Sequence, residues 1–198
     1  MKNSTELIAQ MAAESIRVKT EFFERNAARI AMAAESMAQS LRQGHKVLLF
    51  GNGGSAADAQ HMAAEFVGRF LPDRIPMPAI ALSTDTSVLT ALSNDYGYHM
   101  VFARQIEALA AAGDIAIAIS TSGYSPNVLA ALDAAREKGL LSIGFTGETG
   151  GKMTDRVEIL FRVPSRNTPR IQETHIVLGH ILCELVDREL FPEAYAQE

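Results

Sequence analysis

The stretch KVLLFGNGGSAADAQHMAAEF, residues 46–66, joins an apolar run to a glycine-rich turn and then to a helical pattern. The apolar run 46–52 predicts a buried strand, and residues 55–70 predict a helix that starts directly after the turn. Glycines at the start of a helix allow an anion to approach the backbone N–H groups. The same helix carries His61 and Glu65 four residues apart, on one face.

The rest of the chain repeats this alternation of strands and helices. Apolar runs predict further strands, and helical periodicity predicts further helices. The strands are 78–83, 114–120, 141–147 and 156–164; the helices are two within 5–43, a short helix or turn at 86–95, then 98–111, 125–139 and 168–190. We therefore predict an α/β fold, a three-layer αβα sandwich with a five-stranded parallel sheet. Ligands of such sheets bind beyond the carboxyl ends of the strands.

Length, composition and net charge favour a single domain and argue against several classes of protein. A chain of 198 residues that is 47% hydrophobic suits one domain, with 1–43 as an N-terminal helical extension and 44–198 as the αβα core. The net charge of -5 and the lack of a basic run give no support for nucleic-acid or membrane-surface binding. No apolar stretch is long enough to span a bilayer, and no signal peptide is recognisable. Cys183 is the only cysteine, which points to the cytoplasm and to core packing.

The first candidate anion site is the turn that contains Gly51, Gly53 and Gly54. Together with Ala56 the turn matches a dinucleotide fingerprint, but such turns are common and the match is weak. The acidic residue that binds a ribose usually follows the turn by about 20 residues. Here it could only be Asp85, which comes later than that and beyond Ser83 and Thr84. A purely structural tight turn is the other alternative.

The second candidate anion site follows the predicted strand 114–120. Ser120, Thr121 and Ser122 form a row of hydroxyls, and Ser125 precedes a proline at a helix start. Helix capping by Ser125 would explain that residue but not the other three. Hydroxyls beside a helix start suit a phosphate monoester, and the absence of a P-loop lysine argues against nucleoside triphosphate chemistry.

A metal site is the interpretation that accounts for several polar residues on two predicted helices. His61 and Glu65 lie on the first helix, and Gln172, His175 and His180 lie on the last. Gln172 and His180 are a little over two turns apart and can lean to one side, while His175 could compete. Imidazole, carboxylate and amide ligands would suit zinc. That the two helices meet is an inference at this stage.

Several longer motifs together resemble one family. They are GNGGSAADAQHMAAEFVGRF, ALSNDYG, ISTSGYSPNVLAAL, GFTGETGGKM and RIQETHIVLGHIL, in this order along essentially the whole chain. The combination is similar to the sedoheptulose 7-phosphate isomerases (phosphoheptose isomerases) of the sugar isomerase (SIS) domain superfamily. GNGGS or STSG alone would indicate only a SIS domain.

The resemblance implies a role for each matching residue. It implies one zinc ion per subunit, bound by His61, Glu65, Gln172 and His180, with Glu65 and His180 as the acid/base pair. The implied substrate contacts are Asn52, Gly53, Gly54, Glu65, Asn94, Asp95, Ser120, Thr121, Ser122, Ser125 and Gln172. Ser55 is a further candidate for the phosphate. His175 matches a histidine of the family that is not a metal ligand.

The resemblance also implies a reaction and an assembly. The reaction is an aldose–ketose isomerisation of a phosphosugar, which moves a proton between C1 and C2 through an enediol. The assembly is a homotetramer with active sites where subunits meet. A non-catalytic relative with the same architecture, which binds a replication initiator protein, is the alternative, but it lacks the full zinc set that is present here.

Overall fold

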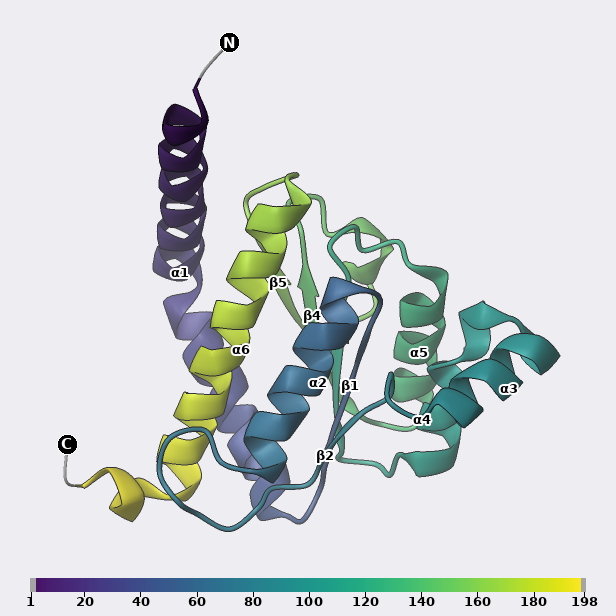
Figure 1. Cartoon of the computed structure of the whole chain (residues 1–198). Coiled ribbons are helices and arrows are strands. Elements are labelled where there is room, and N and C mark those ends of the chain that lie inside the picture. The colour runs from purple at the N-terminus through teal and green to yellow at the C-terminus, as the bar shows by residue number, and fades with distance from the viewer. Residues whose placement is uncertain (1–2, 197–198) are drawn as a thin grey trace.

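Five parallel strands form the sheet at the centre of the molecule, in the order β2-β1-β3-β4-β5 (Figure 1). The computed structural model describes residues 3–196. The strands are β1 (Val47–Gly51), β2 (Ala79–Ala81), β3 (Ile115–Ile119), β4 (Leu141–Thr146) and β5 (Ile159–Arg162). Val47 at the start of β1 pairs with Ala79 on one side and Ile115 on the other. All neighbouring strands run parallel, as the alternation of elements predicted.

Helices cover both faces of this sheet. They are α1 (Ser4–Arg42), α2 (Gly54–Val67), α3 (Thr86–Tyr96), α4 (Ala103–Leu109), α5 (Pro126–Glu137) and α6 (Thr168–Leu190), with short 3-10 turns at 98–100, 151–153 and 192–195. Strand residues alternate between two apolar clusters. Leu49 and Ile117 face α1, α2 and α6, whereas Leu48 and Ala116 face α4 and α5. The predicted αβα sandwich is therefore confirmed.

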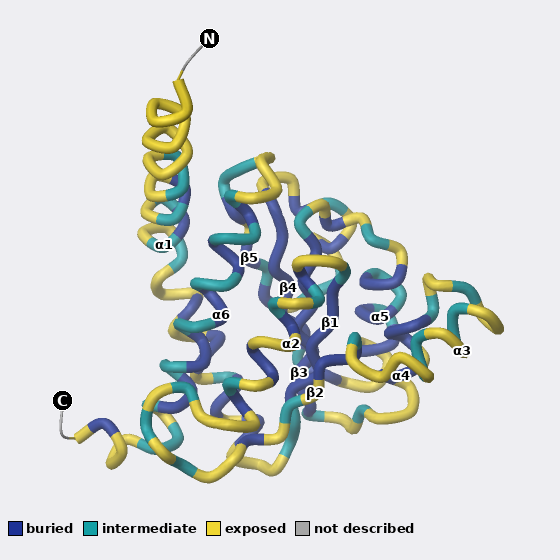
Figure 2. Tube along the Cα trace, in the orientation of Figure 1, coloured by how far each residue is buried: buried dark blue, intermediate teal, exposed yellow. Residues whose placement is uncertain are grey.

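The N-terminal segment differs from the prediction of two helices. It forms one helix of 39 residues, capped by Asn3 and Glu6. No glycine or proline interrupts residues 4–42, so nothing in the sequence ends the helix early. Its second half packs against the sheet and α6, while its first turns are exposed (Figure 2). Among residues 3–196, no helix is long and apolar enough to span a membrane.

The predicted helix 98–111 is also different. It is split into a 3-10 turn at 98–100 and the short helix α4. Val101 and Phe102 lie between the two, and both are buried.

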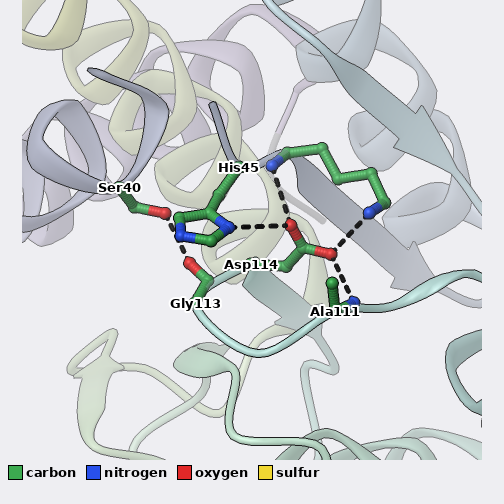
Figure 3. A network of polar contacts seen from close by, with 6 residues as sticks. Ser40, His45, Ala111, Gly113 and Asp114 are labelled. Atoms are coloured by element: carbon green, nitrogen blue, oxygen red, sulfur yellow. Dashed lines mark hydrogen bonds and ion pairs between the residues drawn. The ribbon is translucent and has the colours of Figure 1, made fainter. Parts of the chain in front are cut away.

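A polar network closes the end of the sheet where β1 and β3 begin (Figure 3). The Asp114 carboxylate, which is 1% exposed, accepts a hydrogen bond from Lys46 Nζ at 2.6 Å and one from the Ala111 N–H at 2.8 Å. Burial alone would raise the pKa of Asp114, but these hydrogen bonds outweigh it and lower that pKa. The network lies at the opposite edge of the sheet from the loops that follow β1 and β3.

Candidate active site

The carboxyl ends of β1 and β3 bring the two candidate anion loops together. Because the two strands are neighbours and parallel, both loops leave the same edge of the sheet. They enclose a cavity of about 120 Å³ with a mostly polar lining. Its lining residues are Asn52, Ser55, Ile119, Ser120, Thr121, Ser125 and Gln172. Five of the six polar ones come from the two predicted loops, and Gln172 comes from α6.

Three hydroxyl-bearing residues of the second loop, Ser120, Thr121 and Ser125, line this cavity. Ser120 Oγ lies 3.1 Å from Ser125 Oγ, and Ser120 Oγ also accepts a hydrogen bond from the Gly123 N–H. Ser125 stands at the N-cap position of α5, but its side chain makes no capping hydrogen bond. The capping interpretation of Ser125 is therefore wrong, and its hydroxyl remains available to a ligand. Ser122 is exposed and lines an adjoining cavity of about 270 Å³ with Thr121.

The shape of the second loop depends on a second glycine-rich turn behind it. Gly123 has a positive φ of +69°, and a Cβ at that position would overlap the backbone of Gly150. The Gly123 carbonyl accepts a hydrogen bond from the Lys152 N–H at 2.9 Å, and the Thr121 carbonyl accepts one from the Gly147 N–H at 3.0 Å. The backbone of 147–152 thus supports the hydroxyl loop directly. This explains Gly147 and Gly151, because a Cβ at either position would overlap the backbone of that loop.

The first loop presents the N-terminus of α2 to the same cavity. Gly53 is the N-cap residue with a φ of +56°, and it offers no side chain to cap the helix. A Cβ on Gly54 would lie 3.1 Å from Gln172 Cδ and overlap Gln172 Nε2. The amide of Gln172 therefore rests on the first turn of α2, beside the buried Ser55. This contact joins α6 to the loop after β1.

Asn52 is held by two residues that the sequence did not single out. Its side chain forms a reciprocal amide pair with Asn127 on α5, with N–O distances of 2.9 and 2.8 Å. The Tyr98 hydroxyl donates a third hydrogen bond to Asn52 Oδ1 at 3.2 Å. Asn127 is 2% exposed. The only sequence feature that could have indicated Asn127 is its position directly after Ser125 and Pro126. Asparagine is common at the start of helices for structural reasons, so this position does not point to a role in the site.

Asn94 and Asp95 do not line the cavity in this structure. They hydrogen-bond to each other at 2.8 Å on α3, which is exposed and lies at the edge of the molecule beyond α5 (Figure 1). Tyr98, which follows them, links this region to Asn52. Asp85 caps α3 by accepting a hydrogen bond from the Val88 N–H, a structural role that weakens the dinucleotide interpretation.

His61, Glu65 and His180 come together although 119 residues separate the two histidines. His61 Nε2 lies 2.9 Å from His180 Nε2 and 3.2 Å from Glu65 Oε1. The ring of Phe70 lies against His180, with 5.5 Å between ring centroids. The structure thus confirms that α2 and α6 meet on the faces that carry these side chains. Gln172 is eight residues before His180, about 12 Å along the helix, on the cavity side.

The donor atoms suit zinc in kind. Two imidazole nitrogens and a carboxylate oxygen adjoin, and zinc prefers such ligands at about 2.0–2.2 Å. Within residues 3–196, however, no group of three or more His, Cys, Asp and Glu side chains is arranged as a ready metal site. The 2.9 Å between the histidines is shorter than the roughly 3.3 Å between neighbouring ligands of a tetrahedral zinc ion. Small side-chain shifts would open the cluster to that separation.

Asp58 lies on α2 and His175 on α6, whereas Arg69 follows the end of α2. Asp58 is half-buried with one oxygen lacking a partner, and burial raises its pKa to about 6 against the opposing effect of His61. Arg69 donates a hydrogen bond to the Leu71 carbonyl. His175 is 1% exposed, packs on Phe145, and burial lowers its pKa to about 4. Its place in the core agrees with the expectation that it is not a metal ligand.

Comparison with known proteins gives a consistent family. The family described as SIS domain matches residues 10–147. The chain is 57% identical over 178 residues to the phosphoheptose isomerase of Thermodesulfovibrio yellowstonii, covering 90% of this chain and 89% of that one. It is 56% identical over 182 residues to the phosphoheptose isomerase of Aquifex aeolicus, covering 92% and 95%.

Solved structures agree with these relatives. The phosphoheptose isomerase GmhA of Neisseria gonorrhoeae superposes with a TM-score of 0.88 at 46% identity, covering 93% of this chain and 99% of that one. The phosphoheptose isomerase of Francisella tularensis superposes with a TM-score of 0.91 at 38% identity, covering 94% and 100%. The chain therefore belongs to the phosphoheptose isomerase family of SIS-domain proteins and is a phosphosugar isomerase.

Proposed function

We propose that this protein converts D-sedoheptulose 7-phosphate to D-glycero-D-manno-heptose 7-phosphate, the first step toward activated heptose for lipopolysaccharide or another cell-envelope polysaccharide. One observation carries the proposal: a hydroxyl-lined cavity and the cluster of His61, Glu65 and His180 lie along the same helix, α2. From Gly54 to His61 the helix rises about 10 Å. That separation is of the same order as the length of an extended sugar phosphate.

The two ends of α2 would then handle the two ends of the substrate. Ser55, Ser120, Thr121, Ser122 and Ser125 bind the phosphate, helped by the N-terminus of α2. This remote binding holds C1 and C2 beside the cluster and contributes to the rate by orientation. The substrate contacts assigned to Asn52, Gly53 and Gly54 belong to the same end.

Glu65 and His180 divide the proton transfers. Glu65 removes the proton from the carbon next to the carbonyl, and the enediol forms. His180 protonates the carbonyl oxygen at C2 as the enediol forms. Glu65 then returns its proton to C2, and His180 takes the proton of the C1 hydroxyl, which becomes the aldehyde. His61 touches both groups in the structure and orients them.

His61, Glu65, Gln172 and His180 would hold one zinc ion per subunit. Zinc, when bound, polarises a carbonyl and stabilises negative charge on oxygen. Gln172 reaches the cavity and the first turn of α2, so it serves as a substrate contact as well. In this arrangement Gln172 belongs both to the metal site and to the cavity that binds the phosphate.

A homotetramer with active sites at subunit contacts completes the proposal. The first turns of α1 extend away from the body of the chain and expose Leu7, Ile8, Met11 and Ile16 (Figure 1). Apolar side chains along one exposed helix are typical of a surface that another subunit covers. Asn94 and Asp95, which lie outside the cavity, are available to a substrate at such a contact. We expect no nucleic acid or membrane partner and a cytoplasmic location.

An adapter that binds a replication initiator protein is the second candidate function. The same architecture would serve it, but it needs no cluster of His61, Glu65 and His180. The meeting of these three side chains favours the enzyme. An inactive pure protein that captures initiator protein would favour the adapter instead.

Turnover followed by proton NMR tests the proposal. We expect purified protein to convert sedoheptulose 7-phosphate, to stop after chelation, and to recover when zinc is returned. Glu65→Gln and His180→Gln should each abolish turnover without unfolding the chain. His99→Gln and Glu107→Gln, at exposed positions outside the cluster, are the matched controls. Full turnover by folded Glu65→Gln and His180→Gln would refute the assigned roles.

A further inference from the structure

Arg74 is an arginine buried in the segment between α2 and β2, and it returns to the last turn of α2. Its side chain is 2% exposed. Its Nη2 donates to the carbonyl of Glu65 at 2.9 Å, and its Nη1 donates to the carbonyl of Phe66 at 2.8 Å and to that of Gly68 at 3.3 Å. The last carbonyls of a helix have no partner within it, and a cation at that end is favourable. Arg74 therefore fixes the end of α2 at the residue that carries the Glu65 carboxylate.

The same guanidinium reaches α6. Arg74 Nε donates to Asp187 Oδ1 at 2.9 Å, and the Asp187 side chain is fully buried. Asp187 follows His180 by seven residues, two turns of helix, so both side chains leave the same face of α6. One arginine thus joins the end of α2 behind Glu65 to the face of α6 that carries His180.

A second contact holds the two helices closer to the reacting side chains. A Cβ on Gly179 would lie 2.7 Å from Met62 Sδ, so α2 and α6 touch where Met62 follows His61 and Gly179 precedes His180. This contact and the one between Gly54 and Gln172 lie beside the cluster or on the phosphate side of it, so neither holds the last turn of α2 against α6. The Arg74–Asp187 contact, about 12 Å beyond Gly179 along α6, holds that end of the helix pair.

We propose that the Arg74–Asp187 pair is a positioning device that sets the orientation of α2 relative to α6 and so places His61 and Glu65 against His180. Neither residue lines the cavity between the two loops. The pair acts through the backbone of Glu65 and through the helix that carries His180. This inference rests on the proposed roles of His61, Glu65 and His180.

Stability alone is a weak explanation for such a pair. A buried ion pair is often replaceable by apolar side chains without loss of stability, because the desolvation of two charges offsets their attraction. What apolar residues cannot reproduce is the directed set of hydrogen bonds from one planar group to two helices. If the pair only stabilises the fold, apolar replacements of both residues should preserve activity. If the pair positions the two helices, the same replacements should lower kcat even where stability is kept.

The test compares the turnover of three variants, Asp187→Asn, Arg74→Lys and the double variant Arg74→Met with Asp187→Leu. Each should lower kcat by about 10- to 100-fold, the range for groups that orient catalytic side chains, with KM within about twofold. Lysine keeps the charge, but its single ammonium group cannot reproduce the planar fork by which Nε, Nη1 and Nη2 of Arg74 bond to α2 and α6 at once. KM should hold because the phosphate end of the site lies at the other end of α2.

Asp114→Asn is the matched control, because Asp114 is also a buried carboxylate paired with a cation, Lys46, at the opposite edge of the sheet (Figure 3). We expect it to lower the unfolding temperature but to leave kcat within about twofold. All assays are run where circular dichroism shows each protein fully folded.

Two results would overturn the inference. One is a decrease in kcat that is proportional to the decrease in unfolding temperature across all variants, Asp114→Asn included. The other is an apolar double variant that has wild-type stability and wild-type kcat. Glu65→Gln in the same series separates the failures: if it retains turnover, the proposed catalytic role is wrong; if it is inactive while the Arg74 and Asp187 variants are fully active, only the positioning role is wrong.

Discussion

Gly54→Ala tests whether Gln172 must lie on the first turn of α2. The added Cβ would overlap Gln172 Nε2 and approach Cδ to 3.1 Å, so the amide must retreat. The backbone at Gly54 does not require glycine, because its φ is not positive. The substitution therefore adds one methyl group that acts on a single flexible side chain.

The expected effects on stability and on activity have different sizes. Alanine is favoured over glycine in a helix by up to about 1 kcal/mol, so the free energy of unfolding should stay the same or rise slightly. The amide must move by about 1 Å to restore van der Waals distance. A misplacement of that size can reduce kcat/KM by about 100-fold, equal to about 2.7 kcal/mol.

The assay is a double-mutant cycle on kcat/KM with Gly54→Ala, Gln172→Ala and the combination, alongside urea unfolding of all four proteins. If the methyl group acts through Gln172, Gly54→Ala should cost little more once Gln172 is alanine. Wild-type kcat/KM in Gly54→Ala would refute the reasoning. So would an equal loss in both backgrounds, since the methyl group would then obstruct the substrate or α2 itself.

Three further outcomes are expected. Ser120→Ala and Ser125→Ala should each raise KM by about 5- to 10-fold, the effect of losing one hydrogen bond of about 1 kcal/mol, while kcat changes less. Ser87→Ala on α3 is the control. Unchanged KM values in both the Ser120 and the Ser125 variant would show that these hydroxyls do not bind the phosphate. His175 has a pKa of about 4 when folded, below its usual 6.5, so its contribution to stability is present above pH 6.5 and is lost as the pH falls through 4. Urea unfolding should show wild type losing about 3 kcal/mol more than His175→Leu over that range, and parallel curves would contradict this. Asp58 has a pKa raised to about 6, so its contribution to stability is present below pH 4 and is lost as the pH rises through 6. In the metal-free protein, the free energy of unfolding of Asp58→Asn should exceed that of wild type by about 1 kcal/mol at pH 8 and equal it at pH 4. A difference that does not change with pH would show that Asp58 does not titrate as described.

Local patterns in the sequence were sufficient for the secondary structure and the fold class. Continuous apolar runs such as 46–52 and 114–120 predicted strands covered on both faces, and the structure places them side by side. The position of polar loops after β1 and β3 predicted the cavity, because parallel strands end at one edge. His61 and Glu65 could be placed on one face because four residues are about one helical turn. The errors were also local: a long segment without breakers was divided in two, and a turn that buries Val101 and Phe102 was taken as helix.

Only the tertiary structure decided which distant residues meet. His61 reaches His180, Asn52 pairs with Asn127, and Arg74 joins Asp187, each across 75 residues or more. The hydrophobic periodicity of the sequence does not specify such contacts, because they depend on the position and rotation of each helix relative to its neighbour. The sequence determined which side chains each helix offers and on which face. Packing of α2 against α6, where Gly179 admits Met62, decided that these faces meet as a site.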